Sequence, residues 1–475
     1  MRRHLPRLLS QPEMFRERLV DALGADAVKT APEDLRAYAF DAYTEGRLPS
    51  AVVLPASTRE VSAVVKIARD CGEPIVPRGA GTGLCGGAVP IDGGVVVSFA
   101  RMNRILAYEP ARRRARVQPG LINLDLSRIS AREGLFYAPD PSSQRISTIG
   151  GNIATNAGGP HCLSYGTTIN HVLALEIVDD RGEVFTTDLD RAGYDLTAAF
   201  VGSEGTLGLL TAAWVRLMRL PEAVRVWLAT FPDVDSASDA VSAIIAAGIV
   251  PTALEMMDAV ATRAVEAAFA AGYPTDAGAV LLIEHAGPDD DMHAYEHEIA
   301  RIVREHGANS WRAARTQAEC DALWAGRKGA AGAMGRLAPN YYVQDVCVRR
   351  SVLPQALHTV ERIAREYRLT MANVFHAGDG NLHPLICYDK RDKKQVAAVI
   401  ESGNEILRMA VDLGGTVSGE HGIGFEKRDA MTAIYSTEDL AAMARVREVF
   451  DPQRAFNPEK IFPAGVRCAE VLPVA

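Results

Sequence analysis

Two histidines in one short loop and a Glu-His pair further along the chain are the residues whose types and spacing could do chemistry. His376 and His383 flank the sequence Ala-Gly-Asp-Gly-Asn-Leu. The residues around them predict a strand on either side, and Asp379-Gly380 supplies the turn between the strands. Because such a loop folds back on itself, we expect the two imidazoles to face a common point.

Glu420 and His421 lie in Ser-Gly-Glu-His-Gly-Ile-Gly, where glycines on both sides indicate a close approach of the backbone to something else. Adjacent side chains of an extended segment point to opposite faces. We therefore expect Glu420 to bind a metal ion while His421 points toward a different target. A single histidine of this kind would more often be a packed or hydrogen-bonded residue. Two imidazoles and one carboxylate with open positions predict a catalytic divalent metal site.

A glycine-rich loop follows the strand expected over residues 74–77. It contains Gly81-x-Gly83-x-x-Gly86, whose glycines would let backbone N–H groups approach a pyrophosphate. A nicotinamide-binding fold would require a helix next and an acidic residue about 20 positions further on. Glycines and a proline break the segment after Gly86, and the following strand ends without a carboxylate. The sequence therefore argues against a nicotinamide cofactor.

Two further glycine clusters occupy residues 149–159 and 201–208. Each cluster alone would indicate a tight turn. Three clusters between residues 78 and 208, all with small hydroxyl or amide neighbours, indicate one long ligand that is held mainly by the backbone. An extended dinucleotide fits this pattern better than a small metabolite does.

The predicted helices and strands that must position these residues differ between the first and second halves of the chain. The first 45 residues predict a short helical lead-in. A strand, a helix and a second strand follow, and Ser57-x-x-Glu60 is a capping box that begins the helix. Short strands continue to a boundary at Pro221, and beyond it strands alternate with longer helices. The expected strands are 51–54, 74–77, 95–98, 114–117, 173–178, 184–187 and 209–215, and the expected helices include 295–307, 351–367 and 436–451.

The composition excludes several classes of protein. The chain of 475 residues has a net charge of −8, which argues against a nucleic-acid partner. Its seven cysteines are scattered, so the chain offers neither C-x-x-C zinc pairs nor an iron–sulfur cluster site. We expect no transmembrane segment, because no apolar run of about 18 residues exists. No apolar core follows the basic start of the chain, so we expect a cytoplasmic protein without a secretory leader.

Four segments together resemble the FAD-binding half of the vanillyl-alcohol-oxidase-type flavoproteins. They are residues 77–83, 137–143, 150–159 and 202–205. The remainder resembles the C-terminal half of the D-2-hydroxyacid dehydrogenases of that superfamily, the branch with the FAD-linked subunits of bacterial glycolate oxidases. The resemblance covers nearly the whole chain.

This resemblance implies an α+β fold with a two-subdomain FAD-binding domain of the vanillyl-alcohol-oxidase (PCMH) type, followed by an α/β substrate (cap) domain. The implied domains are a helical lead-in at 1–47, the FAD-binding domain at 48–222, the substrate domain with the metal site at 223–430, and a C-terminal helix and tail at 431–475 that returns to the FAD site.

By the same resemblance, the glycine loops hold the pyrophosphate and the ring system of FAD. The expected cofactor-binding residues are Pro77, Arg78, Gly79, Gly81, Thr82, Gly83, Pro139, Ser143, Gly150, Gly151, Asn152, Ala154, Thr155, Asn156, Gly158, Gly159, Glu204, Gly205 and Asn457. In some members of the superfamily a histidine of the first glycine loop attaches the flavin covalently. Residues 77–87 contain no histidine, so we expect non-covalent FAD. Cys85 and Cys162 are expected to be small packing residues rather than redox groups.

The resemblance also assigns roles to the residues first noted. His376, His383 and Glu420 match residues that bind a divalent metal, commonly zinc, and His421 matches the catalytic base. Manganese and iron also suit such N/O ligands, but zinc is the ion that we expect. Arg327 matches the arginine that binds the substrate carboxylate, although by itself it would be taken for an ordinary arginine on a helix surface.

These assignments predict an FAD-dependent 2-hydroxyacid dehydrogenase that oxidises glycolate, with D-lactate as the alternative substrate, by hydride transfer to the flavin. Residues 329–333, Gly-Ala-Ala-Gly-Ala, lack the polar groups that a second carboxylate would need, which favours a small monocarboxylate. Because the chain has no cluster-forming cysteines, electrons would leave through a partner. The resemblance implies an iron–sulfur subunit and a companion FAD-domain subunit, with the complex peripheral at the inner membrane.

Two alternatives stay open from the sequence. One is a stand-alone D-lactate or other D-2-hydroxyacid dehydrogenase that passes electrons to a quinone or a cytochrome. The other is a non-catalytic FAD-binding assembly subunit, because glycolate oxidase complexes also contain an FAD-domain companion. Such a companion would not need the C-terminal cluster of histidines and glutamate, which this chain keeps.

Overall fold

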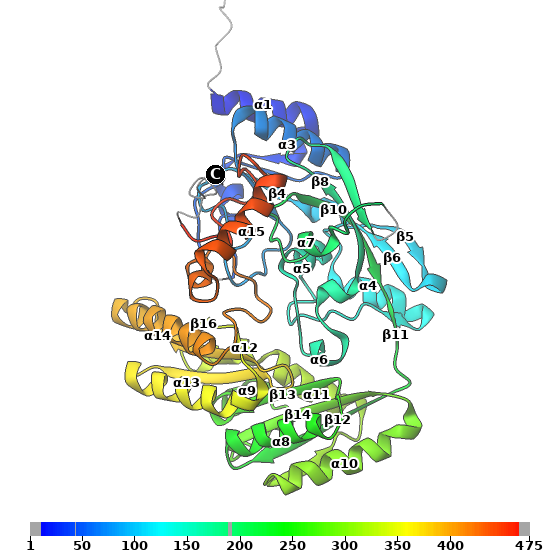
Figure 1. The fold of residues 1–475 in the computed structure, drawn as a ribbon, viewed down its shortest axis with the longest axis vertical. Helices are drawn as coiled ribbons and strands as arrows, with labels where there is room; N and C mark the ends of the chain where they lie inside the picture. Colours follow the sequence, from blue (N-terminus) through cyan, green and yellow to red (C-terminus); the bar gives the residue numbers. More distant parts are fainter. Residues whose placement is uncertain (1–10, 43, 189–191, 465–475) are drawn as a thin grey trace, which may run out of the picture.

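Two lobes stacked along the long axis make up the computed structural model, which describes residues 11–42, 44–188 and 192–464 (Figure 1). The N-terminal lobe holds the elements from α1 (Gln11–Leu23) to β11 (Met218–Arg219). The C-terminal lobe holds those from β12 (Ala223–Phe231) to α14 (Lys393–Asp412).

A small sheet at the start of the N-terminal lobe carries the first glycine loop. Its strands are, in order, β1 (Val28–Lys29), β2 (Ala51–Val53), β4 (Val95–Ser98) and β3 (Ile75–Arg78), and the last three are parallel. The valine-rich β2 and β4 are fully buried, as is usual for parallel strands. Helix α3 (Thr58–Cys71) packs on this sheet and is capped by Ser57, whose Oγ accepts from the Glu60 N–H. The Glu60 carboxylate accepts from the Ala56 N–H instead of the Ser57 N–H, so only half of the predicted capping box is present. The chain leaves β3 directly into the glycine loop.

An antiparallel sheet forms the other half of the N-terminal lobe. Its strands are, in order, β5 (Ile105–Glu109), β6 (Arg114–Val117), β10 (Leu209–Arg216), β8 (Val172–Val178) and β9 (Val184–Asp188). Several short elements pack on it or border it: α4 (Asn123–Ser130), β7 (Leu135–Phe136), α5 (Ile149–Thr155) and α7 (Thr197–Phe200). Helix α2 (Pro32–Arg36) packs on the first sheet instead, and α6 (Cys162–Tyr165) lies against β13 of the C-terminal lobe. The second glycine cluster forms helix α5, which was not predicted; Thr148 caps this helix by accepting from the Gly151 N–H.

A large antiparallel sheet is the centre of the C-terminal lobe. Its strands are, in order, β15 (Ser310–Ala313), β12, β14 (Ala279–Gly287), β13 (Ala253–Asp258), β18 (Thr370–His376), β19 (Asn381–Tyr388) and β16 (Asn340–Val343), with β17 (Val346–Cys347) also on β19. The tight loop between β18 and β19 is the one predicted between His376 and His383. The register of β13 on β18 places Glu255 directly opposite His376.

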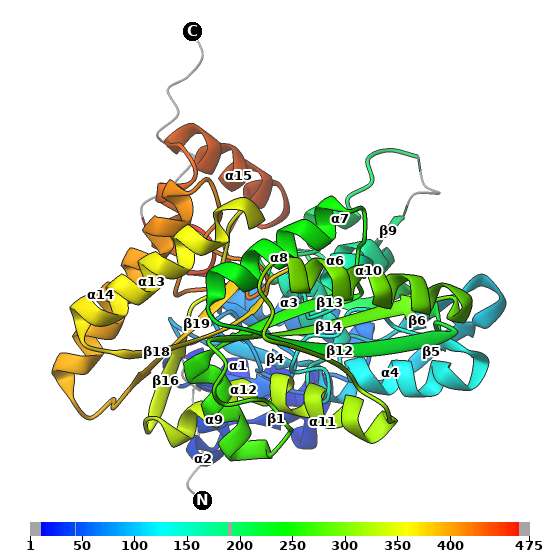
Figure 2. The ribbon, with the colours of Figure 1, turned by 90° about the horizontal axis from the view of Figure 1, so that it is seen from below.

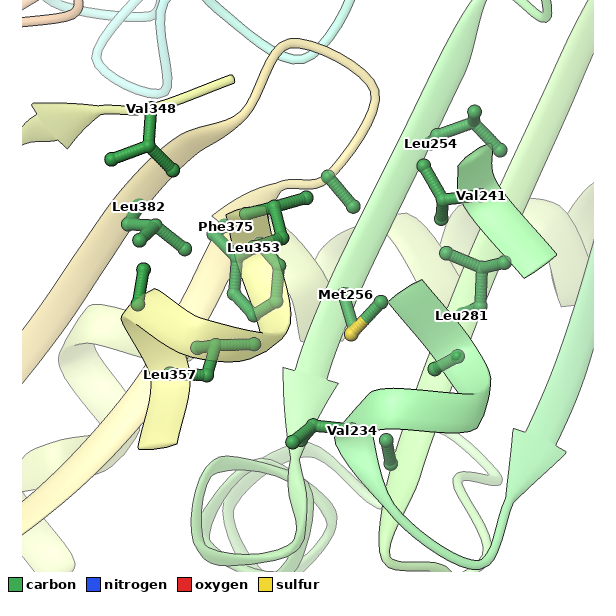
Figure 3. Packing of buried hydrophobic residues seen from close by; sticks show 14 of the residues in the cluster. Val234, Val241, Leu254, Met256, Leu281, Val348, Leu353, Leu357, Phe375 and Leu382 are labelled. Atoms are coloured by element: carbon green, nitrogen blue, oxygen red, sulfur yellow. The ribbon is translucent and has the colours of Figure 1, made fainter. Parts of the chain in front are cut away.

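Helices cover both faces of this sheet (Figure 2). One face packs on α8 (Val234–Ala246), α10 (Met292–Glu305), α13 (Leu353–Tyr367) and α14, and the other on α9 (Ala259–Phe269), α11 (Gln317–Lys328) and α12 (Ala330–Ala333). Figure 3 shows Leu254, Met256 and Phe375 pointing to the α8 and α13 side. Because side chains alternate along a strand, Glu255 and His376 point to the opposite face, the one that α11 covers.

The last helix, α15 (Thr437–Phe450), returns to the N-terminal lobe, where its red ribbon lies beside the first elements (Figure 1). The Phe450 ring meets the Phe200 ring with centroids 5.1 Å apart, and Phe456 is buried in the core of the first sheet. The capping box expected at Ser436 is present, because Ser436 and Asp439 exchange both hydrogen bonds.

The element bounds differ from the predicted ones mainly at helix starts. The helix expected over 295–307 runs from Met292 to Glu305, and the one expected from 351 begins at Leu353 after a single 3₁₀ turn. Of the helical lead-in, residues 1–10 lie outside the described residues. Among the helices that the structure describes, none has the length and apolar character needed to cross a membrane.

Candidate functional site

A cavity between the two lobes brings together most of the predicted site residues. Its N-terminal wall is made of backbone-rich segments, and these contain the following predicted residues: Pro77, Arg78, Gly79, Gly81, Thr82, Gly83, Ser143, Gly150, Gly151, Asn152, Ala154, Thr155, Gly158, Glu204 and Gly205. Its C-terminal wall contains Arg327, His376, His383, Glu420 and His421. The dinucleotide side and the metal side predicted from the sequence therefore share one space.

Glycine is required at several points on the N-terminal wall. A Cβ at Gly79 would lie 2.4 Å from Thr148 Oγ1, and one at Gly205 would lie 2.4 Å from Pro77 Cγ. Gly81 has a φ of +72°, which a residue with a side chain rarely adopts. These constraints leave backbone rather than side chains facing the cavity, which fits a long ligand with phosphate groups.

Four predicted cofactor residues do not line this cavity. The Pro139 carbonyl accepts from Asn123 Nδ2, and Asn156 ends α5 at a φ of 50°. Gly159 packs against Asp140, where a Cβ would lie 2.5 Å from the Asp140 carbonyl oxygen. Asn457 is fully buried and its Nδ2 donates to the carbonyls of residues 87 and 204, at 2.8 and 2.7 Å. In the structure, these four residues support the loops that face the cavity.

Glu204 connects the dinucleotide side with the metal side. Its carboxylate accepts from the backbone N–H of Ile423 at 2.8 Å and of Gly424 at 2.9 Å. Burial raises the pKa of Glu204 above its ordinary value. The side chain thus fixes the loop that carries the Glu-His pair against the glycine loop of the other lobe.

His376, His383 and Glu420 meet at one point of the C-terminal wall. Glu420 Oε1 lies 3.4 Å from His376 Nε2 and 3.2 Å from His383 Nε2, and one ligand atom from each residue lies within 4.8 Å of the others. Burial raises the pKa of Glu420, but the charges of His376 and His383 outweigh burial and hold it well below its usual range. Two imidazole nitrogens and an ionised carboxylate are a donor set that fits a divalent cation.

Glu255 stands behind this group and links it to Arg327. Its Oε1 lies 2.7 Å from His376 Nδ1, and its Oε2 pairs with the Arg327 guanidinium. The Glu255 side chain is 0% exposed and that of Arg327 is 6% exposed, so the ion pair is buried rather than on a helix surface. Burial lowers the pKa of His376, but the carboxylates of Glu255 and Glu420 outweigh it and raise the value to about 10. The same negative charges would favour a metal ion at Nε2.

Asp345 shapes the loop that holds Glu420 and His421. Its carboxylate accepts from the consecutive backbone N–H groups of Gly419, Glu420 and His421, at 3.0, 3.2 and 2.9 Å. Successive N–H groups that converge on one anion require a bent backbone, not an extended one. Lys427 completes the arrangement, since its Nζ donates to the Asp345 carbonyl at 2.8 Å.

The bent loop corrects the expectation that Glu420 and His421 point to different targets. His421 Nε2 lies 3.7 Å from Glu420 Oε1, and the His421 ring stacks on the His383 ring with centroids 5.0 Å apart. Both side chains therefore face the same cavity. Burial lowers the pKa of His421 to about 4, so its imidazole is neutral at neutral pH and can accept a proton.

A second group of potential ligands overlaps the first. Asp345, His383 and His421 also bring one ligand atom each within 4.8 Å of the others. The oxygens of Asp345 are already occupied by backbone N–H groups, by Ser418 Oγ at 2.8 Å and by Asn381 Nδ2 at 2.7 Å. The group of His376, His383 and Glu420 is thus the better candidate for a metal site.

The cavity beyond these residues is largely apolar. Ala330, Ala331, Val343, Val374 and Leu385 line it next to the histidines. Burial raises the pKa of the Cys85 and Cys162 thiols, which fits packing residues.

Sequence reasoning missed Glu255, Asp345 and Lys328 as members of the site. Glu255 and Asp345 each carry a lone charge inside an apolar strand-like run, Ala-Leu-Glu-Met-Met and Tyr-Val-Gln-Asp-Val. Because a buried charge is costly unless it is paired, that pattern is a signal that could have found both residues. Lys328 lines the cavity beside Arg327 and carries no such signal.

Comparisons with known families match both halves of the chain. A model of FAD binding domains matches residues 49–188, and a model of the C-terminal domain of FAD linked oxidases matches residues 220–461. The glycolate oxidase subunit GlcD of Escherichia coli strain K12 is 45% identical over 92% of this chain and 89% of its own length. GlcD of Bacillus subtilis strain 168 is 40% identical over 95% and 97%. A D-lactate dehydrogenase of Anaerostipes hadrus is 33% identical over 87% and 89%.

Solved structures share the fold at lower identity. 4-Ethylphenol oxidase from Gulosibacter chungangensis superposes with a TM-score of 0.79 at 17% identity and covers 98% of this chain and 100% of its own. p-Cresol methylhydroxylase superposes with a TM-score of 0.77 at 16% identity, over 96% and 98%. The predicted α+β fold of the PCMH type is confirmed.

Proposed function

This chain belongs to the FAD-linked oxidases, and on that premise we propose that it catalyses the FAD-dependent oxidation of a small 2-hydroxy acid to the 2-oxo acid. Glycolate is the proposed substrate, because the relatives from Escherichia coli and Bacillus subtilis, at 45% and 40% identity, are glycolate oxidase subunits. D-Lactate is the alternative, because a relative at 33% identity is a D-lactate dehydrogenase.

One observation carries the proposal: a neutral histidine, a carboxylate-binding cation and a divalent-metal donor set share the cavity that the glycine loops line. His421, Arg327 and the three proposed ligands belong to four different segments of the chain. Oxidation of a 2-hydroxy acid needs a base for the hydroxyl proton, a cation for the carboxylate and an acceptor for the α-hydrogen. His421 is the proposed base, Arg327 is the proposed cation, and the FAD that the glycine loops would hold is the proposed acceptor.

The proposed roles follow from the contacts. His376, His383 and Glu420 would hold a divalent ion, with zinc as the proposed one, and the glycine loops would hold non-covalent FAD. When bound, FAD would supply the acceptor for the α-hydrogen as a hydride, and the metal would supply a Lewis acid that lowers the pKa of the substrate hydroxyl, as metals lower that of water from about 15.7 to about 7. His421 would take the hydroxyl proton at Nε2. Arg327 would bind the carboxylate, because it lines the same cavity as the three proposed ligands and a guanidinium can hold a carboxylate through two parallel hydrogen bonds.

The apolar wall supports a substrate with one carboxylate. Ala330, Ala331 and Leu385 offer no partner for a second charged group, and the nearby Lys328 ammonium already pairs with Asp140. Burying a second, unpaired carboxylate against this wall would therefore be costly. Residues of this kind leave room for hydrogen or a methyl group on the substrate carbon.

We further propose that electrons leave through partner subunits, an iron–sulfur subunit and a companion FAD-domain subunit, in a complex on the cytoplasmic face of the inner membrane. The groups of metal-ligating residues in the described part of the chain contain histidine, aspartate and glutamate but no cysteine. A stand-alone dehydrogenase that reduces a quinone or a cytochrome is the alternative. The group of His376, His383 and Glu420, which a non-catalytic assembly subunit would not need, argues against that alternative.

Anaerobic absorbance spectroscopy of the purified protein tests the proposal. Glycolate, D-lactate, L-lactate and D-2-hydroxyglutarate are added in turn, and we expect glycolate or D-lactate to bleach the flavin band. L-Lactate tests which enantiomer the protein oxidises, and D-2-hydroxyglutarate tests whether the apolar wall excludes a substrate with a second carboxylate. A metal-loaded, flavin-containing protein that none of the four acids bleaches would contradict the proposal and favour the assembly subunit.

A further inference from the structure

A buried ionic network joins the two lobes beside the cavity and includes a histidine that the proposed reaction does not use. His161 precedes α6 in the N-terminal lobe, and its ring lies between two carboxylates. Its Nδ1 is 2.8 Å from Asp140 Oδ2, and its Nε2 is 2.9 Å from Glu284 Oε1. Asp140 belongs to the N-terminal lobe and Glu284 to β14 of the C-terminal lobe, so this imidazole bridges the lobes.

Only one protonation state of His161 satisfies both contacts. A carboxylate accepts hydrogen bonds, so each ring nitrogen must donate, and an imidazole with both nitrogens protonated is a cation. Burial lowers the pKa of His161, but the charges of Asp140 and Glu284 outweigh burial and raise it to about 10. The side chains of all three residues are at most 17% exposed. The bridge therefore consists of two largely buried ion pairs. The Coulomb attraction within such pairs is stronger than within pairs at the surface.

Two side chains of α11 complete the network. Trp324 Nε1 donates to Glu284 Oε2 at 2.7 Å, and its indole lies against the His161 ring with centroids 5.4 Å apart. Lys328 Nζ donates to Asp140 Oδ2 at 3.3 Å and lies 5.4 Å from the Trp324 ring centroid. Trp324 and Lys328 are one turn apart on α11, so the end of this helix is attached to both lobes through His161 and its two carboxylates.

That end of α11 is the one that carries Arg327. Arg327 lines the cavity and its guanidinium pairs with Glu255, while the neighbouring Lys328 reaches across to Asp140 in the other lobe. Asp140 lies in the segment 137–143, which also contributes Ser143 to the dinucleotide side of the cavity. The position of Arg327 relative to that side depends on the contacts across the lobes.

We propose that His161 is a positioning residue: as the centre of an interlobe clasp formed with Asp140, Glu284, Trp324 and Lys328, it holds α11 so that Arg327 meets the substrate carboxylate beside the flavin. His161 itself touches neither substrate nor flavin in this role and acts through α11. The inference rests on the proposed function for the roles of Arg327 and the flavin, whereas the clasp itself consists of contacts between the lobes.

Hydrogen exchange of the full-length protein with FAD bound and no substrate tests the clasp. In His161→Gln, whose amide is uncharged and has both N–H donors on a single nitrogen, we expect amide protection over 317–328 to fall at least tenfold. His161→Arg keeps the positive charge and enough donors for both carboxylates, so it should restore protection to within threefold of the unsubstituted protein. His358→Gln is the matched control, because His358 pairs with Asp235 at 3.0 Å within one lobe.

Steady-state kinetics give the second readout. Arg327 binds a carboxylate that is present both before and during the reaction, so a displaced α11 should raise KM at least tenfold while kcat changes less than threefold. Unchanged protection in His161→Gln would overturn the clasp, and so would an equal loss in His161→Gln and His161→Arg. Because exchange is measured without substrate, failure of the protein to oxidise any 2-hydroxy acid would overturn the proposed function and leave the exchange result to decide on the clasp.

Discussion

Glu255 Oε1 lies 2.7 Å from His376 Nδ1, directly across the paired strands β13 and β18. The contact fixes which nitrogen of His376 is free for a ligand, because an N–H at Nδ1 donates to Glu255 and leaves Nε2 toward the cavity. The other oxygen of Glu255 pairs with Arg327. One buried carboxylate thus orients both a proposed metal ligand and the proposed substrate-binding cation.

Glu255→Gln should weaken metal binding and substrate binding together. The amide can still accept from His376 but loses the charge that pairs with Arg327, so both neighbours are held less firmly. Loss of a carboxylate behind a metal-binding histidine typically costs about 10–100-fold in metal affinity. Metal titration into the metal-free protein gives the affinity, and KM for the 2-hydroxy acid should rise in parallel.

The control for this variant is Glu366→Gln, whose carboxylate pairs with Arg362 on the surface of α13. It should leave metal affinity, KM and flavin content unchanged. Normal metal affinity in Glu255→Gln would contradict the role of Glu255, and so would loss of flavin instead of metal, since Glu255 does not line the cavity wall that the glycine loops form.

His421→Asn should retain flavin and metal but lose flavin reduction. The variant removes the only group for which we propose a role as base, and general base catalysis typically contributes about 10²–10⁴-fold. Anaerobic stopped-flow absorbance measures the rate of bleaching, and we expect it to fall by at least about 100-fold. A variant that is reduced at the normal rate would show that another group takes the hydroxyl proton.

Glu420→Ala should lose the metal ion itself. Without this carboxylate, two imidazoles remain, and His376 and His383 together carry no negative charge to hold a divalent cation. Elemental analysis of the purified variant should show a metal content far below that of the unsubstituted protein, while the flavin absorbance stays the same. Full metal content would show that the metal binds at another site, and the group of Asp345, His383 and His421 would then be the next candidate.

Much of the fold was predictable from local patterns. Valine-rich runs marked the buried strands β2 and β4, and capping boxes at Ser57 and Ser436 marked helix starts within one residue. Helix α5 was not predicted, because two glycines in its first turn disfavour a helix by propensity alone. The cap by Thr148 and packing on the second sheet overcome that preference.

The site was predictable where its residues stand in unusual local sequences, and not where they act across the fold. His376, His383, Glu420 and His421 lie in glycine-rich turns, which drew attention to them. The bend that turns Glu420 and His421 to the same side depends on Asp345, more than 70 positions earlier in the chain. No local pattern encodes such a contact, so the direction of the two side chains could not be obtained from their spacing.

Denaturation should release all of the flavin. The cavity wall around residues 77–87 consists mostly of backbone and small side chains, together with Arg78 and Leu84, and that segment contains no histidine to form a covalent bond. After acid or guanidinium treatment and filtration, the yellow absorbance should pass into the filtrate and the polypeptide should have the mass of the unmodified chain. Yellow colour that stays on the polypeptide, or a mass increase equal to FAD, would contradict non-covalent binding.

The stabilisation by His161 should depend on pH in a defined direction. The pKa of His161 is raised from 6.5 to about 10, so its contribution is fully present below pH 6.5 and is lost as the pH rises through about 10. For Asp140, burial raises the pKa, but His161 and Lys328 outweigh burial and lower it from 3.8, so its contribution is lost only as the pH falls below that value. Glu284 is the other charged group against the ring, and the neutral Tyr165 packs beside it.

The difference in melting temperature between the unsubstituted protein and His161→Gln should therefore be largest from about pH 5 to 6.5 and should vanish near pH 10. A difference that stays constant over this range would mean that His161 stabilises the lobes by packing, without its charge.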